Sequence, residues 1–125
     1  MPNHTQHKII ARNNNEWCIL ALSKQGIQID FNYFALAFTE QEFYLICQLM
    51  EDTMAALAAG EPLPRISSSR GVWPCPQQNT VALIFDGRIV RFQSRDLVAF
   101  VELCRQARTF LESQSMHGRL SPSVA

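Results

Sequence analysis

The chain has 125 residues, of which 47% are hydrophobic and 18% are charged, and its formal net charge at pH 7 is zero. This composition is typical of one globular domain and excludes a disordered chain. No run of about 18 apolar residues is present, so a membrane-spanning helix is not expected. The polar residues 1–7 lack the apolar segment of a secretory signal, which predicts a cytoplasmic location.

The charges are not spread evenly along the chain. Residues 1–60 carry three basic side chains against six acidic ones, whereas residues 61–125 carry eight arginines against five acids. Such an asymmetry is compatible with steering of a charged partner, with head-to-tail self-association, or with an intramolecular match between the two halves.

The N-terminal part of the chain predicts a mobile arm over residues 1–7, followed by strands. Residues 8–11 are compatible with a short strand, which the turn-favouring residues 12–15 interrupt. The apolar residues 17–22 predict a buried strand, and residues 23–26 predict a hairpin that leads into the next strand.

An internal repeat is the main feature of the rest of the chain. Apolar residues that alternate along a strand, and apolar residues on one face of the helix that follows, recur together 54 residues later. The matched positions include Ile27/Val81, Ile29/Leu83, Phe31/Phe85, Phe38/Phe92, Phe43/Leu97, Ile46/Phe100, Cys47/Val101, Met50/Cys104 and Leu57/Leu111. A shared offset in a period-2 and a period-3.6 pattern predicts an internal ββα duplication.

The first helix of the repeat is expected to end at Gly60, a residue suited to a left-handed cap. Its apolar surface is wider than the stripe that one sheet covers, because Tyr44, Leu45 and Leu49 extend it. We therefore expect these three side chains to bind a partner or a second copy of the chain.

Residues 61–79 form a connector with four prolines and a run of serines, which predicts little regular structure. Trp73 either packs in the core or binds a partner, and Cys75 is predicted to be an accessible, reactive thiol. The segment 67–71 has hydroxyl groups and an arginine but lacks the spacing of a phosphate-binding loop.

The second repeat contains Asp86-Gly87 between alternating apolar residues, the strongest local signal for a hairpin. Arg88, Arg91 and Arg95 follow it and are interpreted either as a solvated surface or as a site for an anionic partner, including nucleic acid. Residues 115–125 are expected to be a disordered tail.

The cysteines and histidines do not form a metal-binding pattern. Cys18, Cys47, Cys75 and Cys104 contain no Cys-x-x-Cys pair, and the histidines occupy only positions 4, 7 and 117. No metal and no cofactor are therefore expected. Cys47 and Cys104 are predicted to be buried on the apolar faces of their helices.

No nucleophile, base and orienting acid occur together, so no catalytic residue is assigned and no enzyme is expected. The predicted fold is a single α+β domain over 1–125: an antiparallel meander of about six strands with two helices on one face. Its parts are the arm 1–7, the first strands and repeat 8–60, the connector 61–79, the second repeat 80–114 and the tail 115–125.

The predicted function is a non-catalytic protein–protein interaction module, such as an assembly factor, an adaptor or a small subunit, that forms a homodimer or has an obligate protein partner. Tyr44, Leu45, Leu49 and Trp73 are its expected contacts. The alternative is a protein that binds nucleic acid or another anionic ligand through Arg88, Arg91 and Arg95. A third interpretation is thiol chemistry at Cys75.

Overall fold

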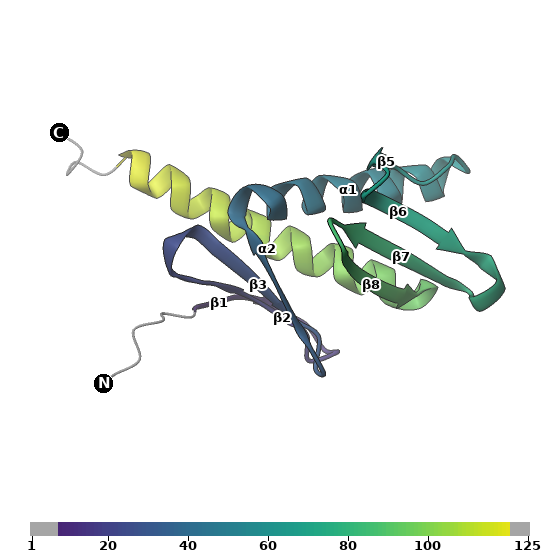
Figure 1. Ribbon diagram of the computed structural model, residues 1–125. Helices are drawn as coiled ribbons and strands as arrows, with labels where there is room; N and C mark the ends of the chain where they lie inside the picture. Colours follow the sequence, from purple (N-terminus) through teal and green to yellow (C-terminus); the bar gives the residue numbers. More distant parts are fainter. Residues whose placement is uncertain (1–7, 121–125) are drawn as a thin grey trace. The chain divides into compact units, whose positions relative to one another are not determined.

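The computed structural model describes residues 8–120, with the side chains of residues 8–114 (Figure 1). The predicted arm over residues 1–7 lies outside the described residues. The elements are β1 (Lys8–Arg12), β2 (Cys18–Ala21), β3 (Gly26–Asp30), β4 (Ala35–Thr39), α1 (Glu40–Ala59), β5 (Arg65–Ser67), β6 (Arg70–Cys75), β7 (Thr80–Phe85), β8 (Arg88–Gln93) and α2 (Ser94–Leu120). Short 3-10 turns, Ser23–Gln25 and Pro76–Gln78, precede β3 and β7.

The strands form two antiparallel four-stranded sheets, in the orders β1-β2-β3-β4 and β5-β6-β7-β8. The α+β class is thus confirmed, but the prediction of a single meander of about six strands is wrong. The reason lies in the connector, which supplies β5 and β6 and gives the second half of the chain a complete sheet of its own. Neither helix in the described part of the chain is both long and apolar enough to cross a membrane.

Pro74 lies within β6 without breaking the sheet. The amide of Val72 donates to the carbonyl of Pro64 at 2.9 Å, on the β5 side of β6. Alternate residues of a strand direct their amides to the same side, so an amide at position 74 would also point toward β5. Strand β5 pairs only with Arg70 and Gly71 and ends before that point. The missing N–H of proline therefore removes no hydrogen bond from the sheet.

The chain divides into two compact units, which are described separately: residues 41–102, and residues 1–40 together with 103–125. The second of these contains the sheet β1–β4 and the C-terminal part of α2. Its register places Ile19, Ile29 and Leu36 on one face, next to Ile27 and Phe38. The ammonium group of Lys8 lies 4.8 Å from the ring centroid of Phe110, so β1 contacts this part of the helix.

The unit of residues 41–102 contains nearly all of α1, the sheet β5–β8 and the start of α2. One face of its sheet is apolar and buried, with Val72, Val81, Leu83, Phe85, Val90 and Phe92. Phe92 stacks on Phe100 of α2 at a centroid distance of 4.7 Å. Arg88, on this same face at the start of β8, pairs with Glu42 of α1. The helix α1 therefore lies on the buried side of the sheet.

The ββα duplication is not confirmed. The bounds of the elements recur at the predicted offset, because β3 and β7 begin at Gly26 and Thr80, and the two helices begin at Glu40 and Ser94. The environments of the matched side chains do not all agree, since Leu57 is 51% exposed whereas its counterpart Leu111 is buried. Common descent of the two halves stays a prediction.

Two local predictions are confirmed by the backbone. Helix α1 ends at Ala59, and Gly60 has a φ of 69°. The hairpin between β7 and β8 turns at Asp86 and Gly87, whose φ angles are 53° and 88°, as a turn with two left-handed residues requires. The predicted tail begins too early, because α2 continues through residues 115–120; the remaining tail residues, 121–125, lie outside the described part.

Candidate interaction surface

The second face of the sheet β5–β8 carries a mixture of apolar and basic side chains, and we call it the outer face. It is defined by the strand residues that alternate with those of the apolar, buried face. The register places them in rows across β6, β7 and β8, and Arg65 of β5 joins the row of Gly71. Its members are Arg65, Gly71, Trp73, Cys75, Thr80, Ala82, Ile84, Ile89, Arg91 and Gln93.

Trp73 lies in the middle of the outer face and is half-buried. The guanidinium carbon of Arg65 lies 4.8 Å from the centroid of its ring, a cation–π contact between neighbouring strands. On the other side of Trp73 the register continues through Ala82 to Arg91. Ala82, between the tryptophan and the arginine, is buried at 4% exposure.

The apolar part of the outer face continues along the next row, where Gly71, Ile84 and Ile89 are paired. Ile84 is half-buried and Ile89 is 52% exposed. Arg65 and Arg91 are both exposed, and none of the strand residues that the register places on this face is Asp or Glu. The outer face is therefore an apolar patch between two cations, with no carboxylate of its own to neutralise them.

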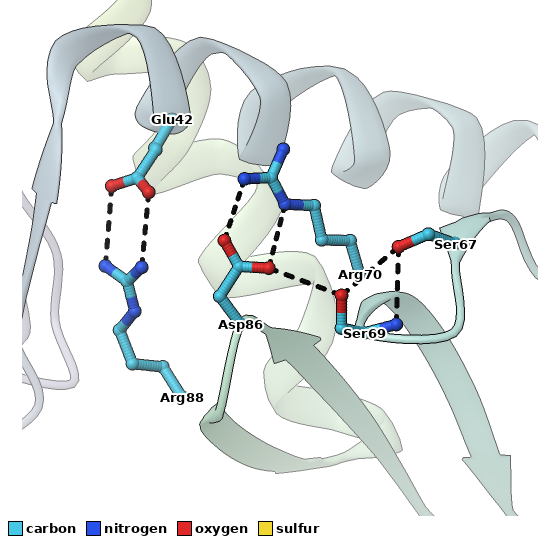
Figure 2. A network of polar contacts seen from close by, with 6 residues as sticks. All are labelled: Glu42, Ser67, Ser69, Arg70, Asp86 and Arg88. Carbon is cyan, nitrogen blue, oxygen red and sulfur yellow. Dashed lines mark hydrogen bonds and ion pairs between the residues drawn. The ribbon is translucent and has the colours of Figure 1, made fainter.

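The structure brings together two residues that the sequence assigned to different sites. Trp73, the expected partner contact in the connector, and Arg91, an expected anion contact, lie in one row of the sheet. Arg88 is on the opposite face, where its guanidinium donates to Glu42 at 3.2 and 3.5 Å (Figure 2). Arg95 is exposed at the start of α2. The three arginines therefore do not form one cluster.

The three predicted partner contacts of α1 differ in their exposure to solvent. Leu45 is 40% exposed and Tyr44 is half-buried, but Leu49 is only 2% exposed. The buried stripe of α1 includes Leu49 and Ala56 and leaves Leu57 outside, contrary to the expected stripe. Leu49 is a core residue and is not available to a partner, whereas Leu45 is.

Arg70 and Asp86 form the centre of a polar network at one end of the sheet (Figure 2). Two guanidinium nitrogens of Arg70 donate to the Asp86 carboxylate at 2.9 and 2.7 Å, and Ser69 Oγ donates to it at 3.4 Å. The hydrogen bond from Arg70 holds the pKa of Asp86 below its ordinary value. The guanidinium of Arg70 is paired with Asp86. The segment 67–71, which joins β5 and β6, therefore uses its arginine within the sheet and is not organised as an anion site.

Two open hollows that were not predicted from the sequence lie beside the loops that follow β1 and β3, in the unit of residues 1–40 and 103–125. They have volumes of about 460 and 260 Å³, and both are lined by Glu16 and Cys18. The larger one is also lined by Asp30, Asn32, Tyr33, Phe34 and Ala35. The Cys18 thiol donates to Asp30 at 3.8 Å, and burial and then the Asp30 charge raise the pKa of this thiol. A raised pKa reduces the thiolate fraction, so Cys18 is not prepared as a nucleophile.

The four thiols are expected to differ in reactivity. Cys47 and Cys104 are 2% and 1% exposed and should alkylate slowest, whereas the half-buried Cys75 should react fastest. Cys18 is also half-buried, but its raised pKa should delay its reaction until higher pH. Timed iodoacetamide labelling of the native protein across pH, read by mass spectrometry, measures each rate.

The substitution Asp30→Asn is the matched test of the Cys18 thiol. It removes a negative charge beside the sulfur, so the pKa of Cys18 should fall and its labelling at neutral pH should accelerate. An unchanged Cys18 rate in this variant, or a Cys47 rate as high as that of Cys75, would contradict the assigned environments.

Among the residues that the structure describes, no group of three or more His, Cys, Asp or Glu side chains is placed to hold a metal ion. The side chains of the three histidines lie outside this part of the chain. Comparison of the chain with protein families, with curated proteins and with solved structures found no match.

Proposed function

We propose that the chain is a non-catalytic protein–protein interaction module, such as an assembly factor, an adaptor or a small subunit, and that it binds its partner through the outer face. The observation that carries the proposal is the exposure of Ile89, at 52%, in a row with Ile84 and next to the row that contains Trp73. Aromatic and arginine side chains around an apolar centre are characteristic of protein interfaces. The proposal includes Tyr44 and Leu45 as contacts, and a cytosolic location, where four cysteines that form no disulfide are stable as thiols.

A second candidate is binding of single-stranded nucleic acid or another anionic ligand. Trp73 between Arg65 and Arg91, on a face without carboxylates, is the observation in its favour. The proposal favours a protein partner because the face also carries Ile84 and the exposed Ile89, and aliphatic side chains offer no stacking surface to a base.

Photo-crosslinking from the outer face tests the proposed function. A benzophenone amino acid at position 89, introduced into the full chain in cells, should yield a discrete protein adduct on irradiation. The same amino acid at position 98 is the matched control, because Val98 is 50% exposed but lies on α2. The position-89 adduct should disappear with Arg91→Glu. Adducts with nucleic acid alone, or no adduct above the position-98 level, would overturn the proposal.

A further inference from the structure

Helix α1 presents a second surface whose chemistry complements the outer face. Exposed residues recur along it at spacings of three and four, which places them in one stripe of the helix. We call this the helix stripe, and it consists of Gln41, Leu45, Gln48, Asp52 and Ala55. Leu45 is its large apolar residue, at 40% exposure, and Asp52 is its exposed acid.

The charge of α1 is of one sign only. The helix contains Glu40, Glu42, Glu51 and Asp52 and has neither lysine nor arginine. The outer face has the opposite composition, with two exposed arginines and no acid. Of these acids only Asp52 belongs to the helix stripe, where it accepts a hydrogen bond from Gln48 at 3.0 Å. The helix stripe therefore presents one carboxylate beside an apolar residue and the outer face presents two arginines beside apolar residues, which favours association of the two surfaces.

The two surfaces face away from each other within the unit of residues 41–102. Arg88 lies on the buried face of the sheet and pairs with Glu42, so α1 covers that face and the outer face is on the other side. The helix stripe consists of exposed residues and points away from the sheet. A single unit therefore cannot satisfy one surface with the other.

We propose that the partner of the outer face is a second copy of this chain, which docks the helix stripe of its own α1 there. This inference rests on the proposed function and names the partner. Leu45 of one copy packs against Ile84 and Ile89 of the other. Asp52 of the first copy forms an ion pair with Arg65 of the second. The neighbouring apolar contact of Leu45 with Ile84 and Ile89 excludes water from this ion pair.

The spacing of the groups agrees on the two surfaces. Leu45 and Asp52 are seven residues apart on one helix, which is about 10 Å at 1.5 Å per residue. Ile84 and Arg65 are two strands apart through Gly71, which is also about 10 Å at 4.8 Å per strand. One helix laid across the strands therefore brings the leucine to the isoleucine and the aspartate to the arginine together.

A contact of this kind is heterologous, because each copy contributes a different surface. A copy that has used its outer face still has a free helix stripe, so association continues into a ring or an open chain and does not stop at a twofold dimer. The uneven charge of the two halves of the sequence is compatible with such head-to-tail association.

Two complementary variants of the full chain test the proposal. Ile89→Glu with Arg91→Glu disables the outer face, and Leu45→Lys with Asp52→Lys disables the helix stripe; all four positions are exposed. In sedimentation velocity the unmodified protein should form species larger than a dimer as concentration rises. Each variant alone should remain a monomer of 14.2 kDa, with self-association weakened at least about tenfold.

Mixing the two variants gives the decisive result. Each retains the surface that the other lacks, so an equimolar mixture should form a 1:1 heterodimer that does not grow further. Val98→Glu and Leu57→Lys are the matched controls, because these exposed apolar residues, at 50% and 51%, lie outside both surfaces. Both controls should assemble like the unmodified protein, and circular dichroism melting should show all variants folded.

Three outcomes would overturn the inference: an unmodified protein that stays monomeric at high concentration, variants that still assemble alone, or a mixture that stays monomeric. The photo-crosslinked adduct from position 89 distinguishes failure of this inference from failure of the proposed function. An adduct with a different protein would leave the interaction module standing and exclude the second copy, whereas no adduct would remove both.

Discussion

Replacing Phe85 by alanine is expected to lower the free energy of unfolding by about 3–5 kcal/mol, the usual cost of removing a fully buried phenylalanine ring. Phe85 is 0% exposed at the end of β7. The guanidinium carbons of Arg70 and Arg88 lie 4.5 and 5.8 Å from its ring centroid. Loss of the ring creates a cavity and also removes the surface on which both cations rest.

Chemical denaturation monitored by tryptophan fluorescence measures this effect. Ile84→Ala is the matched control, because Ile84 is adjacent in β7 but half-buried on the outer face. The control should lose about 1 kcal/mol, since less apolar surface is withdrawn from water there. Equal losses in the two variants would show that the assignment of the faces of β7 is wrong.

Replacing Gly71 by alanine is expected to destabilise the protein by about 1–3 kcal/mol, although alanine is only one methyl group larger. A Cβ atom at this position would lie 2.9 Å from the Cα of Arg65 and 3.1 Å from the carbonyl oxygen of Pro64. Both are backbone atoms, so β5 itself must move away from β6. The contact between Arg65 and Trp73 depends on this approach and should loosen with it.

Hydrogen exchange locates the effect of Gly71→Ala. The amide of Val72 donates to Pro64 and should exchange faster in the variant, while the amides that join β7 and β8 keep their protection. Gly26→Ala is the matched control, because a Cβ there meets only the side chain of Leu22, at 3.4 Å and beyond. Similar stability of the two variants would contradict the close approach of β5.

Local structure was predictable wherever one residue type is required by the backbone. Asp86-Gly87 specified its hairpin because both residues have positive φ, and Gly60 specified the end of α1 for the same reason. The burial of Cys47 and Cys104 also followed from the helical period of their neighbours. These signals depend on residues within one or two turns of each other.

The pairing of strands was not predictable in the same way. Proline in the connector suggested irregular structure, yet Pro74 lies in β6 where its missing amide has no partner strand. An apolar alternation identifies a strand but does not identify its neighbours. For that reason the sequence could not distinguish one meander of about six strands from two sheets of four.

The candidate surface was found only in part. A period of two alone places Arg88 and Arg91 on opposite faces of a strand, so their separation was open to sequence reasoning. The proximity of Trp73 to Arg91 was not, because it depends on the register of three strands. Leu49 was expected at the surface because it lies near the margin of the buried stripe of α1. Leu57 was expected in the core because it has the angular position of the buried residues, but it lies in the last turn of the helix, which ends at Ala59, and is 51% exposed.

The hairpin at Asp86 places two independent demands on one residue. Its φ of 53° is adopted most readily by glycine, asparagine and aspartate. Its side chain must also be a carboxylate, because it receives both hydrogen bonds from Arg70. Asparagine adopts this backbone conformation but has one carbonyl oxygen in place of two carboxylate oxygens, and glutamate has the carboxylate but adopts the conformation less readily. Aspartate is therefore the residue that best meets both demands, although the side chain lies at the surface.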